Sequence, residues 1–423
     1  MLKSNTVNLG WTTSTSSKIV YSVMRLLCLL MYIGRYYNKT RFSGLETHIA
    51  NSYANSLLQL MRFTPLIRNL ALHHTATKCL YETCLLCEMG FLFDMLEKAN
   101  GQNCQATNFL KTFSNLSHAA SLGLLEENSL IRPLTLMIQS VNRFLLEKLA
   151  ADYRLMSPQT SRLDQALTTV AMSSIRCAHC TNETMRPGGT YVHELIYPPK
   201  IPTKVPRSHD PSFSQILKTS VERHEQTRGW CDRCKRYQQL GARKTIQSVP
   251  PVIMINAAAH SPEAKQLWSK PRWLPQEIGI IVDQGQFFCY EGQDLVSHIR
   301  RGVFKITVYE LIGFVADINA GEHQKSHLVS MINGMPSSSV KYQINDCCPV
   351  SPSMKEKRIE NEWHLFNDFL VRRVTNDEAL RFDPTWKLPS ILTYQIKSAR
   401  HGIDDSWKDK LDASLLYHDW SLP

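Results

Sequence analysis

Two C-x-x-C pairs constrain the fold of this chain more than any other feature of its sequence. About fifty residues separate Cys177-Ala-His-Cys180 from Cys231-Asp-Arg-Cys234. A C-x-x-C turn brings two thiolates to one ion, and two such turns supply the four sulfur ligands of a closed structural zinc site. Both pairs lie in polar stretches, where unligated cysteines are not expected to be buried. We therefore predict a zinc ion bound by Cys177, Cys180, Cys231 and Cys234.

Other residues near C-x-x-C pairs are weaker candidates for metal binding. His179 is a possible substitute ligand in the first pair, although four sulfurs are the simpler set. A third pair, Cys84-Leu-Leu-Cys87, has Cys79 just upstream and lies in an apolar run without turn residues. Because free cysteine packs as a small apolar side chain, we expect these three cysteines to belong to the core.

Composition indicates a globular chain in a reducing environment. With 423 residues and 43% hydrophobic content, the chain can bury a large core. The 48 Lys and Arg against 37 Asp and Glu give a net charge of +11, which would suit an acidic partner such as RNA. These basic residues are scattered, so charge alone does not establish RNA binding. Twelve cysteines without an evident cleavable signal peptide favour the cytosol or nucleus.

The N-terminal segment, residues 1–35, cannot be assigned with the rest. Its apolar run, Ile19 to Ile33, is shorter than the roughly 20 residues that a membrane-spanning helix needs, and Arg25 interrupts it. We therefore expect no membrane association.

Hydrophobic periodicity predicts an α+β fold, with a helical lobe followed by an antiparallel sheet. Helices are expected at 51–71 with a break at Pro65, at 81–100 and at 134–149. Apolar and β-branched runs then predict strands at 191–197, 249–258, 277–283, 303–316 and 390–396.

The stretch GLETHIANSYANSLLQ, from Gly44 to Gln59, resembles the cysteine box of ubiquitin-specific proteases. That box reads G-L-x-N-x-G-N-T-C-Y-x-N-S-x-x-Q, and its nucleophilic cysteine falls here on Ser52. The asparagine that helps to form the oxyanion hole in that family falls on Ala50. A change of register restores no thiol, because the sequence has no cysteine from Arg41 to Arg68.

Further boxes of the same family follow. The strand sequence VPPVIMI is similar to its central strand, and YELIGFV followed by Ser326-His327-Leu328 is similar to its histidine box. The segment WHLFND resembles its last box, in which the residue matching Asn367 orients the histidine. The resemblance implies a papain-like cysteine peptidase fold with a zinc-binding finger at 176–235, and a degenerate triad of Ser52, His327 and Asn367. An alcohol is much harder to ionise than a thiol, so we expect no catalysis.

Long runs narrow the resemblance to the central domain of the catalytic subunits of the poly(A)-nuclease deadenylation complex. They include YNKTRFSGLE and WHLFNDFLVRRVTNDEALRFDPTWKLPSILTY. The resemblance implies an inactive ubiquitin-protease-like domain at 36–398 and, at 399–423, a linker toward a missing exonuclease domain. Such a nuclease binds Mg²⁺ through a D-x-E pair, and no D-x-E occurs in this sequence. Magnesium is therefore expected only in that other domain.

The resemblance implies a non-catalytic scaffold in the shortening of mRNA poly(A) tails. Its expected partners are the exonuclease domain and the regulatory pseudokinase subunit, with poly(A)-binding protein and poly(A) mRNA contacted indirectly. The expected location is the cytoplasm, including P-bodies, with the nucleus as an alternative. Two other functions stay open: an active deubiquitinase with an unrecognised nucleophile, and a ubiquitin-binding module without catalysis.

Overall fold

The computed structural model describes residues 38–47, 51–77, 79, 81, 83–125, 133–156, 162–198, 210–319, 326–334 and 363–399. The N-terminal segment 1–35 with its apolar run, Ala50, and residues 400–423 of the expected linker lie outside the described residues. Among the helices that the structure describes, none combines the length and the apolar character needed to cross a bilayer.

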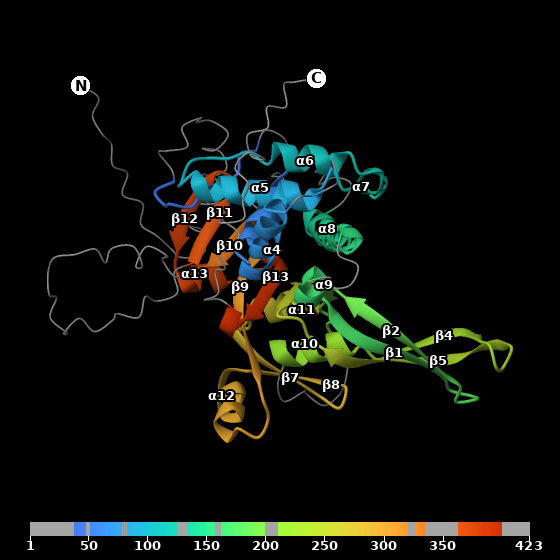
Figure 1. Ribbon diagram of the computed structural model, residues 1–423. Helices are drawn as coiled ribbons and strands as arrows, with labels where there is room; N and C mark the ends of the chain where they lie inside the picture. The colour runs from blue at the N-terminus through green and yellow to red at the C-terminus, as the bar shows by residue number, and fades with distance from the viewer. Residues whose placement is uncertain are drawn as a thin grey trace, which may run out of the picture.

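Helices dominate the first part of the described chain (Figure 1). They are α3 (Ser52–Arg62), α4 (Pro65–Thr75), α5 (Leu85–Lys98), α6 (Thr107–Ser114), α7 (Ser117–Ser121), α8 (Leu134–Met156) and α9 (Arg162–Leu167). The predicted break at Pro65 is confirmed: Thr64 is extended, and Pro65 begins α4, where its missing N–H costs no helical hydrogen bond. The helix expected at 81–100 begins only at Leu85, because Cys84 is extended.

The second part is built on a nine-stranded sheet, in which seven strands follow the order β12-β11-β10-β9-β13-β6-β3. In addition, β7 pairs with β9, and β8 pairs with β7. All its pairs are antiparallel except β3 with β6. The strands are β3 (Val192–Glu194), β6 (Val252–Asn256), β7 (Glu277–Asp283), β8 (Gln286–Glu291), β9 (Thr307–Ile318), β10 (His327–Asn333), β11 (Trp363–Asn367), β12 (Leu370–Val374) and β13 (Lys387–Ile396). The predicted antiparallel sheet is thus present.

A separate four-stranded sheet forms a finger that projects from the body of the molecule (Figure 1). Its order is β2-β1-β5-β4, from β1 (Thr169–Cys177), β2 (Glu183–Thr190), β4 (Glu225–Cys231) and β5 (Arg236–Ser248). Hydrophobic alternation could not predict β2, because seven of its eight residues are exposed. Cys177 and Cys231 end β1 and β4, so the two C-x-x-C turns come together where these strands end.

The strand-rich half also contains helices that periodicity did not predict. They are α10 (Phe213–Glu222), α11 (Pro262–Trp268), α12 (Gly292–Arg301) and α13 (Asn376–Leu380). One of them had a readable start: the Ser212 side chain accepts the Gln215 N–H, and the Gln215 side chain accepts the Ser212 N–H. This reciprocal capping box begins α10.

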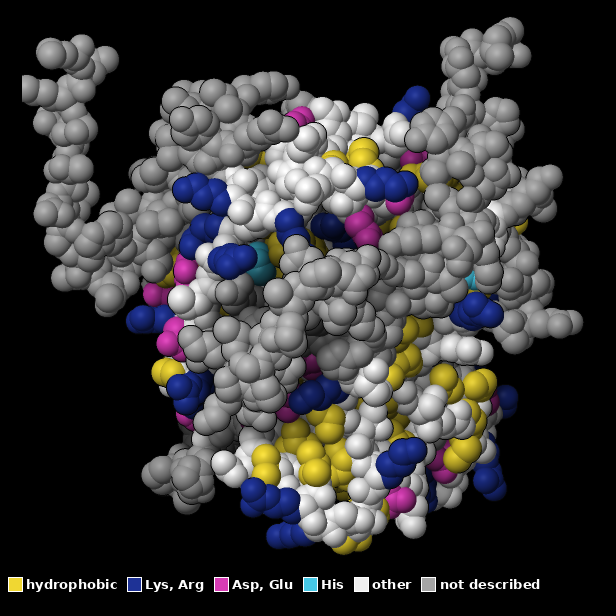
Figure 2. Space-filling view, turned by 60° about the vertical axis from the view of Figure 1, so that its left-hand side comes forward, with side chains coloured by type: hydrophobic (Ala, Val, Ile, Leu, Met, Phe, Trp, Pro, Cys, Tyr) yellow, Lys and Arg dark blue, Asp and Glu magenta, His cyan; other side chains and the backbone are white. Residues whose placement is uncertain are grey.

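Two apolar cores hold the fold together. One packs the helical lobe and includes residues of the central strands, and the other lies among the strands of the large sheet, α10 and α11. Helix α3 is buried along its whole length, polar residues included. In the face drawn in Figure 2, Lys and Arg side chains are spread out and apolar side chains gather in the lower part. This distribution agrees with the scattered basic residues of the sequence.

Candidate functional site

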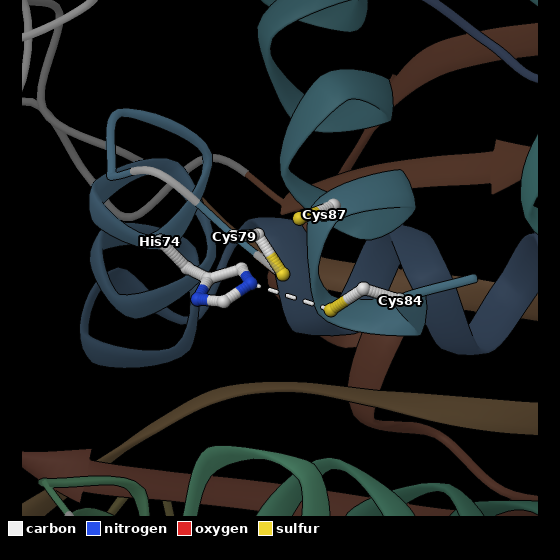
Figure 3. Close-up of side chains that lie close together, drawn as sticks. All are labelled: His74, Cys79, Cys84 and Cys87. Carbon is white, nitrogen blue, oxygen red and sulfur yellow. Dashed lines mark hydrogen bonds between the residues drawn. The ribbon is translucent and has the colours of Figure 1, made fainter. Parts of the chain in front are cut away.

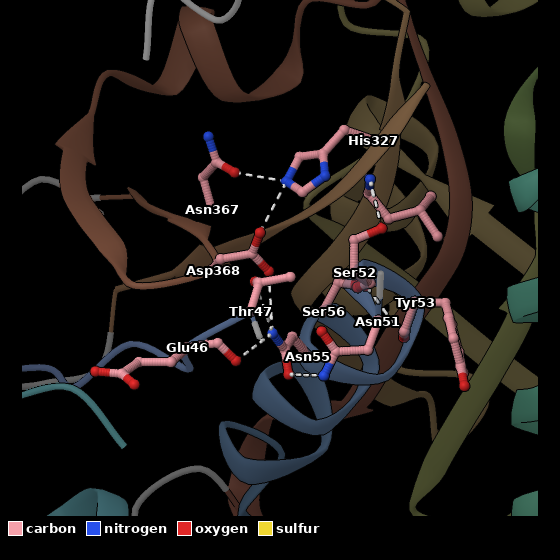
Figure 4. Close-up of polar contacts among 11 residues, drawn as sticks. Glu46, Thr47, Asn51, Ser52, Tyr53, Asn55, Ser56, His327, Asn367 and Asp368 are labelled. Carbon is pink, nitrogen blue, oxygen red and sulfur yellow. Dashed lines mark hydrogen bonds and ion pairs between the residues drawn. The ribbon is translucent and has the colours of Figure 1, made fainter. Parts of the chain in front are cut away.

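Ser52 lies at the first position of α3, where the nucleophile of the resembled box would be. Its side chain is buried, with 2% of the residue exposed. The hydroxyl oxygen accepts the backbone N–H of Leu328 on β10 at 3.5 Å (Figure 4). The start of a helix favours a thiolate through its unpaired N–H groups, but an alcohol at this position stays neutral.

His327 and Asn367, two positions of the degenerate triad implied by the resemblance, lie side by side. Imidazole Nε2 of His327 lies 2.6 Å from Asn367 Oδ1 (Figure 4). Because an amide oxygen only accepts hydrogen bonds, Nε2 is the donor in this contact. The arrangement that orients a histidine base is therefore retained.

Asp368 is a part of this site that sequence reasoning missed. Its Oδ2 atom lies 3.4 Å from His327 Nε2, and its Oδ1 atom accepts Asn55 Nδ2 at 3.0 Å. Its backbone carbonyl accepts the N–H of Leu45 at 3.1 Å. Asp368 has a φ of +51°, in the left-handed region that Asp tolerates in turns. The segment WHLFND contains Asp368 and was the available signal, but a role was assigned there only to Asn367.

Asn55 and Gly44 contact the turn between β11 and β12, which contains Asp368. The Asn55 amide donates to Asp368 and lies 3.4 Å from both the Glu46 carbonyl and Thr47 Oγ1 (Figure 4). A Cβ atom at Gly44 would come within 2.5 Å of Phe369 Cα, so only glycine permits this approach. The contacts join α3, the 44–47 segment and the β11–β12 turn into a structural junction.

An apolar cavity of about 580 Å³ opens beside the start of α3. Its lining includes Asn51, Tyr53, Leu110, Phe113 and Leu125. The neighbouring Ala50 lies outside the described residues, so the expected loss of an oxyanion donor rests on its residue type alone.

The four predicted zinc ligands converge in the finger. Their sulfur atoms all lie within 4.8 Å of one another. Cys180 Sγ is 3.5 Å from Cys231 Sγ, and Cys177 Sγ is 4.0 Å from Cys234 Sγ. A zinc ion with Zn–S bonds of about 2.3 Å separates its sulfurs by roughly 3.8 Å, so this set fits the ion.

The two turns of the finger have the same backbone geometry, which suits a shared ligand. Thr181 N–H donates to Cys177 O and Lys235 N–H to Cys231 O, and both donors have positive φ. Hydrogen bonding from the Cys180 backbone lowers the pKa of Cys177 to about 7, which favours a thiolate. His179 contacts Cys234 Sγ through Nδ1 at 3.7 Å, beside the four sulfurs.

A second group of metal-ligating side chains was missed. His74, Cys79, Cys84 and Cys87 also place their ligand atoms within 4.8 Å of one another (Figure 3). The prediction that these cysteines belong to the core is confirmed, because Cys84 is buried in the core of the helical lobe and Cys79 and Cys87 pack against it. Their expected place inside a helical run was wrong, because Cys84 is extended and precedes α5. The spacing C-x₄-C-x₂-C, with a histidine five residues before the first cysteine, was the available signal. Two tetrads among the described residues could therefore hold zinc.

Comparison with known proteins agrees with this geometry. The sequence profile of ubiquitin carboxyl-terminal hydrolase matches residues 43–371. The chain therefore belongs to the ubiquitin carboxyl-terminal hydrolase family.

Individual relatives are more specific than the family profile. The chain is 64% identical over 389 residues to the PAN2-PAN3 deadenylation complex catalytic subunit PAN2 of Phaeosphaeria nodorum, covering 91% of this chain and 33% of that protein. It is 54% identical over 388 residues to the corresponding subunit of Aspergillus clavatus, covering 92% and 32%. The chain thus spans about a third of the length of these relatives.

Solved structures give the same result. The Neurospora crassa Pan2 catalytic unit, described as protease and nuclease domain, matches with 38% identity and a TM-score of 0.76, over 91% of this chain and 62% of that one. The Saccharomyces cerevisiae PAN2 pseudoubiquitin-hydrolase shares the fold at 22% identity and a TM-score of 0.66, over 88% and 90%. The predicted resemblance to the pseudo-ubiquitin-hydrolase domain of the deadenylase subunit is confirmed, and so is the fold class.

Proposed function

We propose that this chain is a non-catalytic scaffold segment of a poly(A)-shortening deadenylase. The observation that carries the proposal is Ser52, a buried alcohol at the position where the family has its nucleophilic cysteine. Beside Ser52, Asn55 and Asp368 join three segments through polar contacts of 3.0 to 3.4 Å.

The scaffold would support a nuclease domain and a partner subunit. The relatives are named as catalytic subunits of the PAN2-PAN3 complex, and one solved relative contains a protease and a nuclease domain. We propose that this chain packs against an exonuclease domain, supports assembly with a regulatory pseudokinase subunit, and meets poly(A) mRNA only through them. The cytoplasm is the proposed location.

We further propose that Cys177, Cys180, Cys231 and Cys234 bind one structural zinc ion. Four thiolates leave zinc no open coordination position, so such an ion would stabilise the finger without taking part in catalysis.

Ubiquitin cleavage is the first test. Incubation with a fluorogenic ubiquitin substrate should give no turnover above buffer, for the wild-type chain and for Ser52→Ala alike. Ser52→Cys restores the thiol, and we expect it to stay at least 100-fold below an active family member, since one missing oxyanion donor costs about 10²–10³ in kcat. Wild-type turnover that Ser52→Ala abolishes would establish the alternative, an active deubiquitinase.

The second test measures support of the nuclease. The full-length deadenylase carrying Ser52→Ala should shorten a poly(A) RNA at the wild-type rate, because Ser52 has no chemical role. The isolated chain should bind the separate exonuclease domain in a pull-down and change its rate on poly(A). Absence of both binding and any rate effect contradicts the scaffold role. Calorimetric titration with ubiquitin, for which we expect no heat of binding, tests the ubiquitin-binding alternative.

A further inference from the structure

The second Cys/His tetrad joins the ends of two packed helices. His74 lies in the last turn of α4, Cys84 immediately precedes α5, and Cys87 lies in the first turn of α5. Cys79 comes from the connection between them. Figure 3 shows the His74 imidazole and the sulfurs of Cys79, Cys84 and Cys87 pointing toward one another. Four ligand-type groups from three successive segments therefore face one small volume.

Distances within the tetrad fit a tetrahedral ion. His74 Nε2 lies 3.3 Å from Cys84 Sγ. A zinc ion with bonds of about 2.0 Å to nitrogen and 2.3 Å to sulfur places these two atoms roughly 3.5 Å apart. All four ligand atoms lie within 4.8 Å of one another, the same limit that the finger sulfurs satisfy. The tetrad therefore has the dimensions of a four-coordinate site.

The helix termini position three of the four ligands, His74, Cys84 and Cys87. Cys84 is extended, and its carbonyl accepts the N–H of Glu88 as the first helical hydrogen bond of α5. A Cβ atom at Gly90 would lie 2.5 Å from Ala71 O, so α4 and α5 are too close at this point for any side chain larger than that of glycine. This approach brings the C-terminal turn of α4, with His74, against the N-terminal turn of α5.

Charge and burial suit zinc as well. His74 and Cys84 are buried, with 3% and 4% exposed, whereas Cys79 and Cys87 are half-buried. Three thiolates and a neutral imidazole around a divalent ion carry a net charge of −1. That charge would lie at the N-terminus of α5, where unpaired backbone N–H groups stabilise an anion.

We propose that His74, Cys79, Cys84 and Cys87 bind a second structural zinc ion that clamps α4 to α5. The ion closes the connection between the two helices and keeps no open coordination position. Binding releases the protons of the three thiols, because zinc takes thiolates. This clamp is separate from the finger and does not depend on the scaffold role.

Metal stoichiometry tests the proposal on the intact chain. Elemental analysis of protein purified without chelator should give two zinc ions per chain. Cys177→Ser/Cys180→Ser, which removes the finger site, should retain one, and Cys84→Ser/Cys87→Ser should also retain one. Cys289→Ser is the matched control, because this half-buried cysteine lies in β8 outside both tetrads and should leave two.

Cobalt spectra and thiol counts give independent readings. Cobalt in the finger variant should show thiolate-to-cobalt charge transfer with the ligand-field bands of a Cys₃His centre, at shorter wavelength than those of a Cys₄ centre. One zinc ion per wild-type chain, lost entirely in the finger variant, overturns the proposal. A disulfide within the tetrad would also overturn it. In that case, wild-type protein denatured without reductant would show two reactive thiols fewer than its cysteine count, and the Cys84→Ser/Cys87→Ser variant would show no such deficit. If Cys84→Ser/Cys87→Ser does not fold, the wild-type and finger-variant counts decide alone.

Discussion

Gly90→Ala tests the close contact that positions the second tetrad. Helix propensity alone predicts that alanine stabilises an interior helical position by about 1 kcal/mol over glycine. The structure predicts the opposite, because the new Cβ atom would lie 2.5 Å from Ala71 O and 2.4 Å from Thr75 Cγ2. The carbonyl belongs to the α4 backbone and cannot rotate away, so the helices must separate. Overpacking of this kind costs roughly 1–3 kcal/mol, which leaves a net loss of about 1 kcal/mol.

Urea unfolding measures this change, and chelator competition measures its consequence for zinc. Separating α4 from α5 moves His74 away from Cys84 and Cys87, so one of two bound zinc ions should transfer to the chelator faster in Gly90→Ala. The finger zinc should keep its wild-type rate. Gly188→Ala is the matched control, because a Cβ atom there meets no atom within 4 Å and its φ is not positive.

A stabilisation of Gly90→Ala by about 1 kcal/mol would refute the reasoning, since propensity would then outweigh the backbone contact. Equal rates of zinc transfer from Gly90→Ala and wild type would show that the close helix contact does not control zinc binding by the second tetrad.

Three further predictions concern buried polar groups. Burial lowers the pKa of His193 to about 4. As the pH falls, the unfolded chain is protonated at this histidine before the folded chain is, so wild-type stability should fall by roughly 3 kcal/mol between pH 6.5 and 4. Urea unfolding of His193→Gln over this pH range should lack that part of the fall. Burial lowers the pKa of Lys387 to about 7, so wild-type stability should rise by about 1.4 kcal/mol per pH unit from pH 7 toward 10, and an equal rise in Lys387→Met would contradict this. Asn55→Ala removes the donor to Asp368 and should cost roughly 1–3 kcal/mol in thermal or urea unfolding; an unchanged midpoint would show that the junction carries no stability.

Local patterns predicted the elements whose chemistry is local. Pro65 ends one helix and begins another because proline lacks an N–H, and this effect needs no distant partner. The C-x-x-C turns of the finger were readable because each pair sets its own turn, with a left-handed residue directly after the second cysteine. The exposed strand β2 was not readable, because neither of its faces is apolar.

The second tetrad shows how a local pattern can mislead. The two leucines of Cys84-Leu-Leu-Cys87 suggest the interior of a helix, and both are buried as expected. The backbone at Cys84 is extended, however, so the pair marks the beginning of α5 and faces His74. Hydrophobic periodicity indicates which residues are apolar. It does not indicate that the end of another helix, here the one with His74, lies against them.

The sequence by itself determined the family, the absence of a thiol at position 52 and the finger cysteines, because residue identity and short spacing are written directly in the chain. Only the tertiary structure decided that Asp368 contacts Asn55, 313 residues away, and that His74 meets three cysteines across a helix contact. Such neighbours arise when helices and sheet pack around shared cores, and packing depends on many residues at once. The chemistry of single positions was therefore readable in advance, whereas their assembly into a junction and a second tetrad was not.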